Sequence, residues 1–359
     1  MPNFLPGADL IAMPAPAALL RLLLIATLAL HMLLLSLTLG GGLIAFVAGI
    51  CGRRFKNPHA QAFSRKFSAA LPVILAFAIT FGVAPLLFVQ VLYGQFFYSA
   101  TILMAWPWLS VVAVMIVAYY LLYARTFGKV GAGAGLLALG LLAWVAFMYV
   151  NVSTLSMTPK KWWTIWLASH AGLALNLAEP TLLPRFAHLL VGMVAVAGIG
   201  IAAYGAIQQK ADPKYGRWVK AHGALWFAGA TLVQLAVGRW LLLSLPRKIG
   251  GQFLGADVAR TVHLFTAVGV AVLALLLAVG VRKRAARAPI VVCAILIALV
   301  VAVMVAVREW VREAYLADYL TAANVEVQTT AVIIFFALFA IGLAVIAWML
   351  LKTARRERA

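Results

Sequence analysis

Three histidines lie within or at the ends of apolar stretches, where an ionisable side chain is costly and usually serves a function. His31 lies inside the first such stretch, His188 near the start of the fifth, in RFAHLLVG, and His263 near the start of the seventh, in RTVHLFTA. Two neutral imidazoles that face each other at one depth can hold the iron of a six-coordinate b-type haem. The alternative is that each histidine is a hydrogen-bond partner between helices. We expect His59 and His222, beside basic loops, to be solvated or to face lipid headgroups.

A charged segment, REWVREAY, follows the eighth apolar stretch. It supplies Glu309, whose carboxylate could ligate iron, and Arg312, which could neutralise the propionates of a haem. Trp310 lies between them and could contact the same cofactor. The alternative interpretation is a snorkelling arginine beside a tryptophan of the aromatic belt. Cys51 and Cys293 form no CxxCH motif, which excludes covalent attachment of a c-type haem.

The composition predicts the elements that must position these residues. Of 359 residues, 65% are hydrophobic and only 11% are charged, with a mean hydropathy of +1.04, which is too apolar for a soluble domain. We predict an all-α polytopic membrane protein, a single helical bundle over residues 1–359 with no internal repeat and no soluble domain. About nine transmembrane helices are expected: 20–48, 69–93, 103–124, 131–152, 186–207, 221–245, 261–281, 288–307 and 329–351.

The basic residues predict the orientation of the chain. The segments 53–66, 125–129, 210–220, 282–287 and 352–358 lie on one side under this nine-span arrangement, and they hold 19 of the 29 lysines and arginines. Excess Lys and Arg mark the cytoplasmic side, so the N-terminus is expected outside and the C-terminus in the cytoplasm. The net charge of +20 then faces the anionic lipid of the bilayer. We expect no nucleic-acid binding, and a multi-pass protein of a bacterial or archaeal inner membrane.

Four segments resemble subunit I of the cytochrome bd quinol oxidases. HMLLLSLTLGGGLIAF, which begins at His31, is similar to that family's segment of a ligand histidine followed by Leu-Thr-Leu-Gly. EPTLLPRFAHLLVG matches the spacing before the histidine of the family's low-spin haem. EWVREAY is similar to the family's E-x-G-R-Q-P-W box, and ILMAWPWLS to its G-L-M-A-F-F-L-E-S segment. The four segments keep the family's order along nearly the whole chain.

The resemblance implies a role for each candidate residue. His188 would ligate a low-spin haem b, with His263 as its second ligand where the family usually has methionine. Glu309 would ligate a high-spin haem, with Arg312 holding the haem region, and His31 would ligate a further one. One to three b-type haems are implied in all. A d-type haem is possible within the family, but nothing in this sequence supports it.

Two departures from the family point away from its usual reaction. Thr101 and Leu109 stand where the family places acidic residues for haem ligation and proton delivery. The sixth and seventh stretches are joined by the short segment LPRKIGGQFLGADVAR, where quinol oxidases carry a long quinol-binding loop. The usual quinol site is therefore expected to be absent.

Three functions remain open at this point. The leading hypothesis is a haem-binding respiratory membrane subunit that carries electrons near the outer face and exchanges them with a c-type cytochrome or another redox subunit. The first alternative is a bd-type terminal oxygen reductase with a non-quinol electron donor. The second is a transporter or membrane scaffold without haem. The resemblance also implies a second membrane subunit, since subunits I of the family pair with a homologous partner.

Overall fold

The chain folds into helices throughout the part of it that the structure describes. The structure is a computed structural model, and it describes residues 12–282, 286–320 and 327–356. Within these ranges nine helices are long and apolar enough to cross a membrane. The β structure found there is one isolated bridge between Met13 and Val327. The predicted class, an all-α polytopic membrane protein with nine spans, is confirmed.

The first span is continuous over Ala17–Arg54 and contains a π-helical turn at Leu37–Gly41. In chain order the elements are α1 (Ala17–Ser36), η1 (Leu37–Gly41), α2 (Gly42–Arg54), α3 (Pro58–Leu103), α4 (Ala105–Thr126), α5 (Ala132–Ser156), η2 (Pro159–Lys161), α6 (Trp162–Ala168), α7 (Leu182–Gln208), α8 (Pro213–Ser244), α9 (Arg247–Gly250), η3 (Gly251–Phe253), α10 (Val258–Val281), α11 (Ala288–Leu316) and α12 (Thr329–Arg356).

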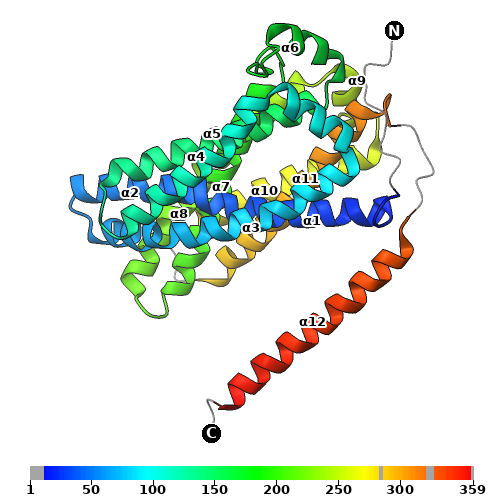
Figure 1. Ribbon diagram of the computed structural model, residues 1–359. Helices are drawn as coiled ribbons and strands as arrows, with labels where there is room; N and C mark the ends of the chain where they lie inside the picture. The colour runs from blue at the N-terminus through cyan, green and yellow to red at the C-terminus, as the bar shows by residue number, and fades with distance from the viewer. Residues whose placement is uncertain (1–11, 283–285, 321–326, 357–359) are drawn as a thin grey trace.

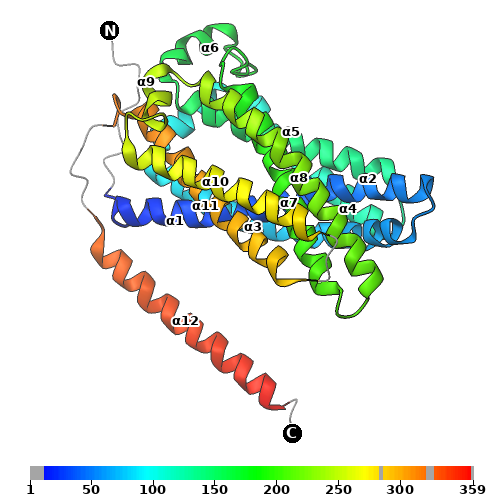
Figure 2. The same ribbon diagram turned by 180° about the vertical axis from the view of Figure 1, so that it is seen from behind.

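The long helices form one elongated bundle, and α12 lies apart from it (Figures 1 and 2). The short helices α6 and α9 cover one end of the bundle. The basic connections after α2, α4 and α7 lie at the other end, where α10 ends and α11 begins. This separation is the one expected if the basic end faces the cytoplasm. The orientation of the termini stays a prediction, and we call the α6 and α9 end the outer end on that basis.

Two helices begin at least eight residues earlier than predicted, because their first turns are polar yet well capped. α3 begins at Pro58 rather than at residue 69, and the side chain of Asn57 accepts hydrogen bonds from two backbone N–H groups of its first turn. α8 begins at Pro213 rather than at residue 221, and Asp212 caps it in the same way. Hydropathy marks only the part of a helix that lies in lipid, whereas caps and a first-turn proline mark its true start.

Two helices, α3 and α11, also end nine or ten residues later than predicted. α3 continues to Leu103 rather than to residue 93, after a local departure from helical geometry at Tyr93. α11 continues to Leu316 rather than to residue 307, so Glu309 and Arg312 lie within its last turns and not after it. Both of these side chains are buried. Their mutual ion pair lets the helix carry charge into the bundle.

Small residues hold α7 and α8 together over most of their length. A Cβ atom added at Gly223 would lie 2.5 Å from the backbone nitrogen of Ala202, and one at Gly198 would lie 2.5 Å from the backbone nitrogen of Phe227. Such close backbone contact is typical of helix pairs in membranes, where small residues permit dense packing. The same pair joins α10 and α11 in a core that contains Ala202, Phe227, Ala274, Ala278, Ile290 and Cys293.

We expect Gly223→Leu to destabilise the protein by about 1–3 kcal/mol or more, because the new side chain would overlap the backbone of α7. Gly229→Leu is the matched control on the same helix, since a Cβ atom at Gly229 meets no other atom within 4 Å. Thermal unfolding in detergent compares the two variants. Equal stability of both would contradict the packing described for α7 and α8.

Candidate functional site

A buried carboxylate lies between two arginines near the outer end of α11. Glu309 is 5% exposed, and its Oε2 lies 2.8 Å from Nη1 of Arg312, which is 4% exposed. Its Oε1 lies 2.7 Å from Nη1 of Arg308, whose side chain is 39% exposed. Arg308 also donates to Ser153 of α5 at 3.3 Å. The carboxylate thus links two guanidinium groups within α11, and one of them ties that helix to α5.

Arg312 reaches from α11 to the bend in α3. Its Cζ lies 4.9 Å from the centre of the Tyr93 ring, a cation–π contact. The Tyr93 hydroxyl is buried and has no hydrogen-bond partner among the described residues. The departure from helical geometry at Tyr93 therefore coincides with the place where α3 meets the charged turns of α11.

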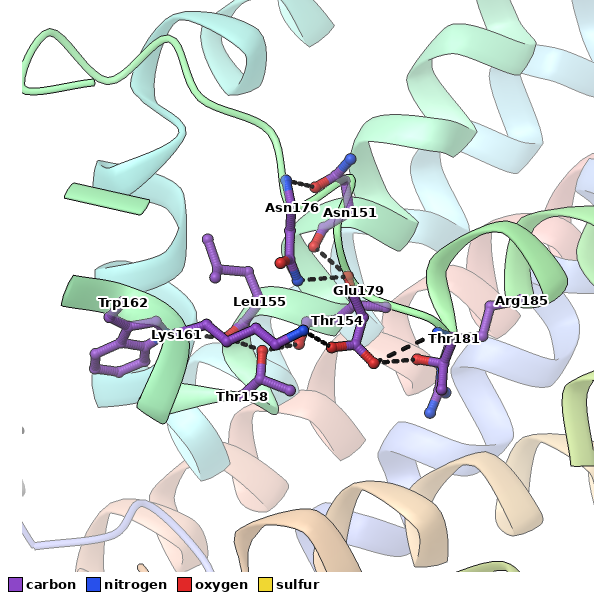
Figure 3. Close-up of polar contacts among 10 residues, drawn as sticks. All are labelled: Asn151, Thr154, Leu155, Thr158, Lys161, Trp162, Asn176, Glu179, Thr181 and Arg185. Atoms are coloured by element: carbon purple, nitrogen blue, oxygen red, sulfur yellow. Dashed lines mark hydrogen bonds and ion pairs between the residues drawn. The ribbon is translucent and has the colours of Figure 1, made fainter. Parts of the chain in front are cut away.

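A second polar cluster joins the segment after α5 to the start of α7 (Figure 3). Oε2 of Glu179 forms an ion pair with Nζ of Lys161 at 2.6 Å, and Oε1 of Glu179 accepts a hydrogen bond from the Thr181 hydroxyl at 3.0 Å. Thr181 in turn accepts from Nε of Arg185 at 3.1 Å. Cζ of Arg185 lies 5.8 Å from the centre of the Tyr315 ring of α11.

Two asparagines fix the backbone of this segment. The backbone N–H of Asn176 donates to the side chain of Asn151 at 2.9 Å, and both residues are fully or almost fully buried. The contact folds residues 157–181 back over the end of α5 (Figure 3). Glu179 and Arg185 were not among the residues selected from the sequence. The Thr181–Arg185 contact is an i,i+4 pair, the one local signal for this cluster.

Cations outnumber carboxylates in these two clusters. Lys161 pairs with Glu179, Arg308 and Arg312 pair with Glu309, and Arg185 bonds to Thr181 beside Glu179. Nη2 of Arg185 and the hydroxyl of Tyr315, whose ring lies against the guanidinium, are both buried and have no hydrogen-bond partner among the described residues. A buried guanidinium N–H without an acceptor is costly. An anionic group with carboxylate or phosphate oxygens would satisfy it, and two haem propionates have that chemistry.

His188 lies one helical turn further into the bundle than Arg185, on the same helix. The side-chain nitrogen of Gln234 on α8 lies 3.0 Å from Nδ1 and 3.1 Å from Nε2 of His188, and it donates to the His188 carbonyl at 3.0 Å. A Cβ atom added at Gly238 would lie 3.4 Å from the imidazole, so the ring lies against α8. Iron ligation would require the ring to turn away from Gln234.

His263 has its contacts on its own helix and on α11. Its Nδ1 lies 2.6 Å from the carbonyl oxygen of Ala259. Its exposed ring meets the ring of Trp310 edge-on at a centroid distance of 5.2 Å. Because a carbonyl only accepts, Nδ1 carries the proton, and in the neutral ring Nε2 keeps its lone pair. The structure therefore brings His263 and Trp310 together, whereas the contacts of His188 lie on α8.

His31 has a similar arrangement between α1 and α3. Its Nδ1 lies 2.8 Å from the carbonyl oxygen of Ala78, which fixes the proton on that nitrogen. Gly82 leaves room for the ring, since a Cβ atom there would lie 2.7 Å from it. Nε2 of His31 has no hydrogen-bond partner among the described residues. A backbone carbonyl that orients the imidazole in this way is typical of metal-ligating histidines.

His222 differs from the expected solvated histidine. It is partly buried, its ring stacks on Trp218 at 4.6 Å between centroids, and its Nε2 accepts from the indole of Trp226 at 3.2 Å. The long first turns of α8 place this residue in the bundle wall instead of the connecting loop. Aromatic packing on both sides supports a structural role.

The donor set suits a haem better than a bare metal ion. Among the described residues no group of three or more His, Cys, Asp or Glu side chains could hold a metal. Haem iron needs only one or two protein ligands, since the porphyrin supplies four nitrogens. The free Nε2 lone pairs of His31 and His263, and the unsatisfied Arg185, therefore fit the polar needs of a haem.

The two departures noted in the sequence are also visible in the structure. Thr101 is buried, and its hydroxyl donates to the carbonyl of Tyr98 at 2.9 Å, within α3. Leu109 is 59% exposed on α4. Neither side chain carries a carboxylate. Between α8 and α10 the chain forms only α9 and η3.

The fold is similar to that of a solved bd oxidase. A chain of the solved structure of bd oxidase from Geobacillus thermodenitrificans superposes with a TM-score of 0.67 and 14% sequence identity, over 96% of this chain and 100% of the other. No protein-family model matches the sequence, and no curated protein matches it. The protein thus has a bd oxidase-like membrane fold with a sequence far removed from that relative.

Proposed function

We propose that this protein is a haem-binding respiratory membrane subunit that carries electrons near the outer face of the membrane. The observation that carries the proposal is the Nη2 atom of Arg185, which lies one turn from His188, is buried and has no hydrogen-bond partner among the described residues, within a bd oxidase-like bundle. Buried cations of this kind favour a bound carboxylate. A bound haem b would supply reversible one-electron chemistry at its iron.

The chain's own residues would then have distinct roles. His188 and His263 would hold a low-spin haem b by their imidazole nitrogens, and Arg185 and Arg312 would bind its propionates. Trp310 would pack beside His263, as it does in the structure. Gln234 would release the His188 ring and keep its contact with the His188 carbonyl.

His31 and Glu309 are the candidates for further haem iron. His31 is well prepared, since its Nδ1 proton is directed at a carbonyl and its Nε2 lone pair is free. Glu309 has both oxygens in ion pairs, so ligation would require one pair to open. Its contacts favour the role of counter-ion to Arg308 and Arg312.

The proposed electron partners lie outside this chain. A c-type cytochrome or another redox subunit would exchange electrons at the outer end, and a second membrane subunit would complete the complex. The bd oxidase-like fold supports a membrane complex of several subunits, and the location in a bacterial or archaeal inner membrane follows from the same proposal.

Spectroscopy of the purified protein tests the proposal. We expect a b-type signal in the dithionite-reduced minus oxidised spectrum and in a pyridine haemochrome assay, with no response to carbon monoxide. A carbon monoxide shift would instead favour an oxygen reductase with a non-quinol donor, to be examined by oxygen uptake with a reduced cytochrome. Absence of haem from folded protein supplied with haem would leave a transporter or scaffold.

The second ligand of the low-spin haem has its own test. We expect His263→Met to keep a low-spin spectrum but to raise the midpoint potential, because a thioether ligand stabilises ferrous iron more than an imidazole does. Potentiometric titration of the haem measures the shift. His263→Ala serves for comparison and should turn the haem high-spin, and a wild-type potential in both variants would exclude His263 as a ligand.

A further inference from the structure

Three side chains connect the outer segment of the chain to Arg185 (Figure 3). Lys161 is paired with Oε2 of Glu179 at 2.6 Å, and Oε1 of Glu179 accepts from the Thr181 hydroxyl at 3.0 Å. The Thr181 oxygen accepts from Nε of Arg185 at 3.1 Å. The contacts run without a break from η2 to the first turns of α7.

The donor and the acceptor of each hydrogen bond in this series of side chains are fixed by chemistry. A guanidinium can only donate and an ionised carboxylate can only accept, so the Thr181 hydroxyl must accept from Arg185 and donate to Glu179. Of these four side chains, Thr181 is the one that both donates and accepts a hydrogen bond. A side chain without a hydroxyl at this position would interrupt the series.

We call this series of contacts, Lys161–Glu179–Thr181–Arg185, the Arg185 tether. It opposes the usual behaviour of an arginine near a helix end. Such a side chain normally extends its head towards water. Here Nε is held by Thr181, the residue that precedes α7, and Nη2 stays buried near the Tyr315 ring with no hydrogen-bond partner among the described residues. The tether therefore fixes the free edge of the guanidinium inside the protein.

We propose that Lys161, Glu179 and Thr181 are positioning residues that hold the free edge of Arg185 towards a propionate of the bound haem. This inference rests on the proposed function, and it adds to it the device that orients the cation. The segment 157–181, fixed by Asn151 and Asn176, then controls the electrostatics of the cofactor although it lies outside the spanning helices.

The matched pair Thr181→Val and Thr181→Ser tests the Arg185 tether in full-length, haem-loaded protein. We expect Thr181→Val to lose about tenfold in haem affinity, equivalent to one charge-assisted hydrogen bond. Its midpoint potential should fall, because a guanidinium that moves away from the haem no longer stabilises the reduced form. Thr181→Ser keeps the hydroxyl and should match wild type. Thr158→Val, whose hydroxyl bonds only to the carbonyls of Thr154 and Leu155, is the control in the same segment.

A second variant gives a shift of opposite sign. Glu179→Gln retains an oxygen that can accept from Thr181 but removes one negative charge, so the midpoint potential should rise. General loss of structure would not move the two variants in opposite directions. If Thr181→Val is too unstable to purify, Thr181→Ala takes its place, because it also lacks the hydroxyl that joins Arg185 to Glu179.

Two results would overturn the inference, and they are distinguishable. A haem-loaded Thr181→Val protein with the potential and haem affinity of Thr181→Ser would exclude the tether and leave the proposed function intact. Wild-type protein that folds but takes up no haem would overturn both proposals together.

Discussion

His188→Ala is expected to abolish the low-spin b-type signal of the haem-loaded protein, because the variant lacks the imidazole that would hold the iron beside Arg185. The remaining haem would be lost or become high-spin, since one axial position would be empty. The reduced minus oxidised spectrum and the haem content per protein measure the two outcomes. Added imidazole should restore part of the low-spin signal by entering the space that the side chain leaves.

His222→Ala is the control for this experiment. His222 also lies within the bundle, on α8, but its ring is packed between Trp218 and Trp226. Its loss should change stability and leave the haem spectrum as it is. A low-spin signal that survives His188→Ala and disappears in His222→Ala would assign the ligand to the other end of the bundle.

Glu309→Gln is expected to lower the free energy of unfolding by about 3 kcal/mol, since it leaves two guanidiniums without their shared negative charge. The contribution of Arg308 is the smaller part, because its side chain is 39% exposed and water screens its charge. Arg312 is 4% exposed and accounts for most of the loss. Chemical or thermal unfolding in detergent measures it.

Glu313→Gln is the matched control, four residues further along the same helix. Oε1 of Glu313 lies 3.2 Å from Nη1 of Arg21, and the side chain of Glu313 is 26% exposed and that of Arg21 48%. An exposed pair of this kind contributes at most about 1 kcal/mol. The double variant Glu309→Gln, Arg312→Met should recover part of the lost stability, since it removes the more deeply buried unpaired charge. Equal losses in Glu309→Gln and Glu313→Gln would contradict a buried charge cluster.

The sequence was sufficient to predict the nine spans, because hydropathy is a direct measure of what lipid accepts. It misplaced the ends of α3, α8 and α11. Asn57 and Asp212 begin their helices in polar surroundings that a hydropathy window reads as loop. Glu309 and Arg312 extend α11 because they neutralise each other, an i,i+3 pairing that is visible in the sequence once the helix is assumed to continue.

The candidate site was harder to predict, since depth in the membrane does not determine which neighbour a side chain faces. His188 and His263 were chosen for similar depth, yet one lies against Gln234 on α8 and the other against Trp310 on α11. The tether of Arg185 depends on the return of residues 157–181 over α5, which is fixed by a contact between Asn151 and Asn176, 25 positions apart. No local pattern encodes a contact at that separation.

The separate position of α12 has a consequence for how the protein is made. None of its apolar window, within Thr329–Thr353, is buried, and all the residues assigned to the two polar clusters and to the haem precede it in the chain. The ribosome therefore synthesises the eight other spans, and every residue proposed to hold the cofactor, before this last helix. If the proposed function holds, a product that stops before Thr329 should still load haem.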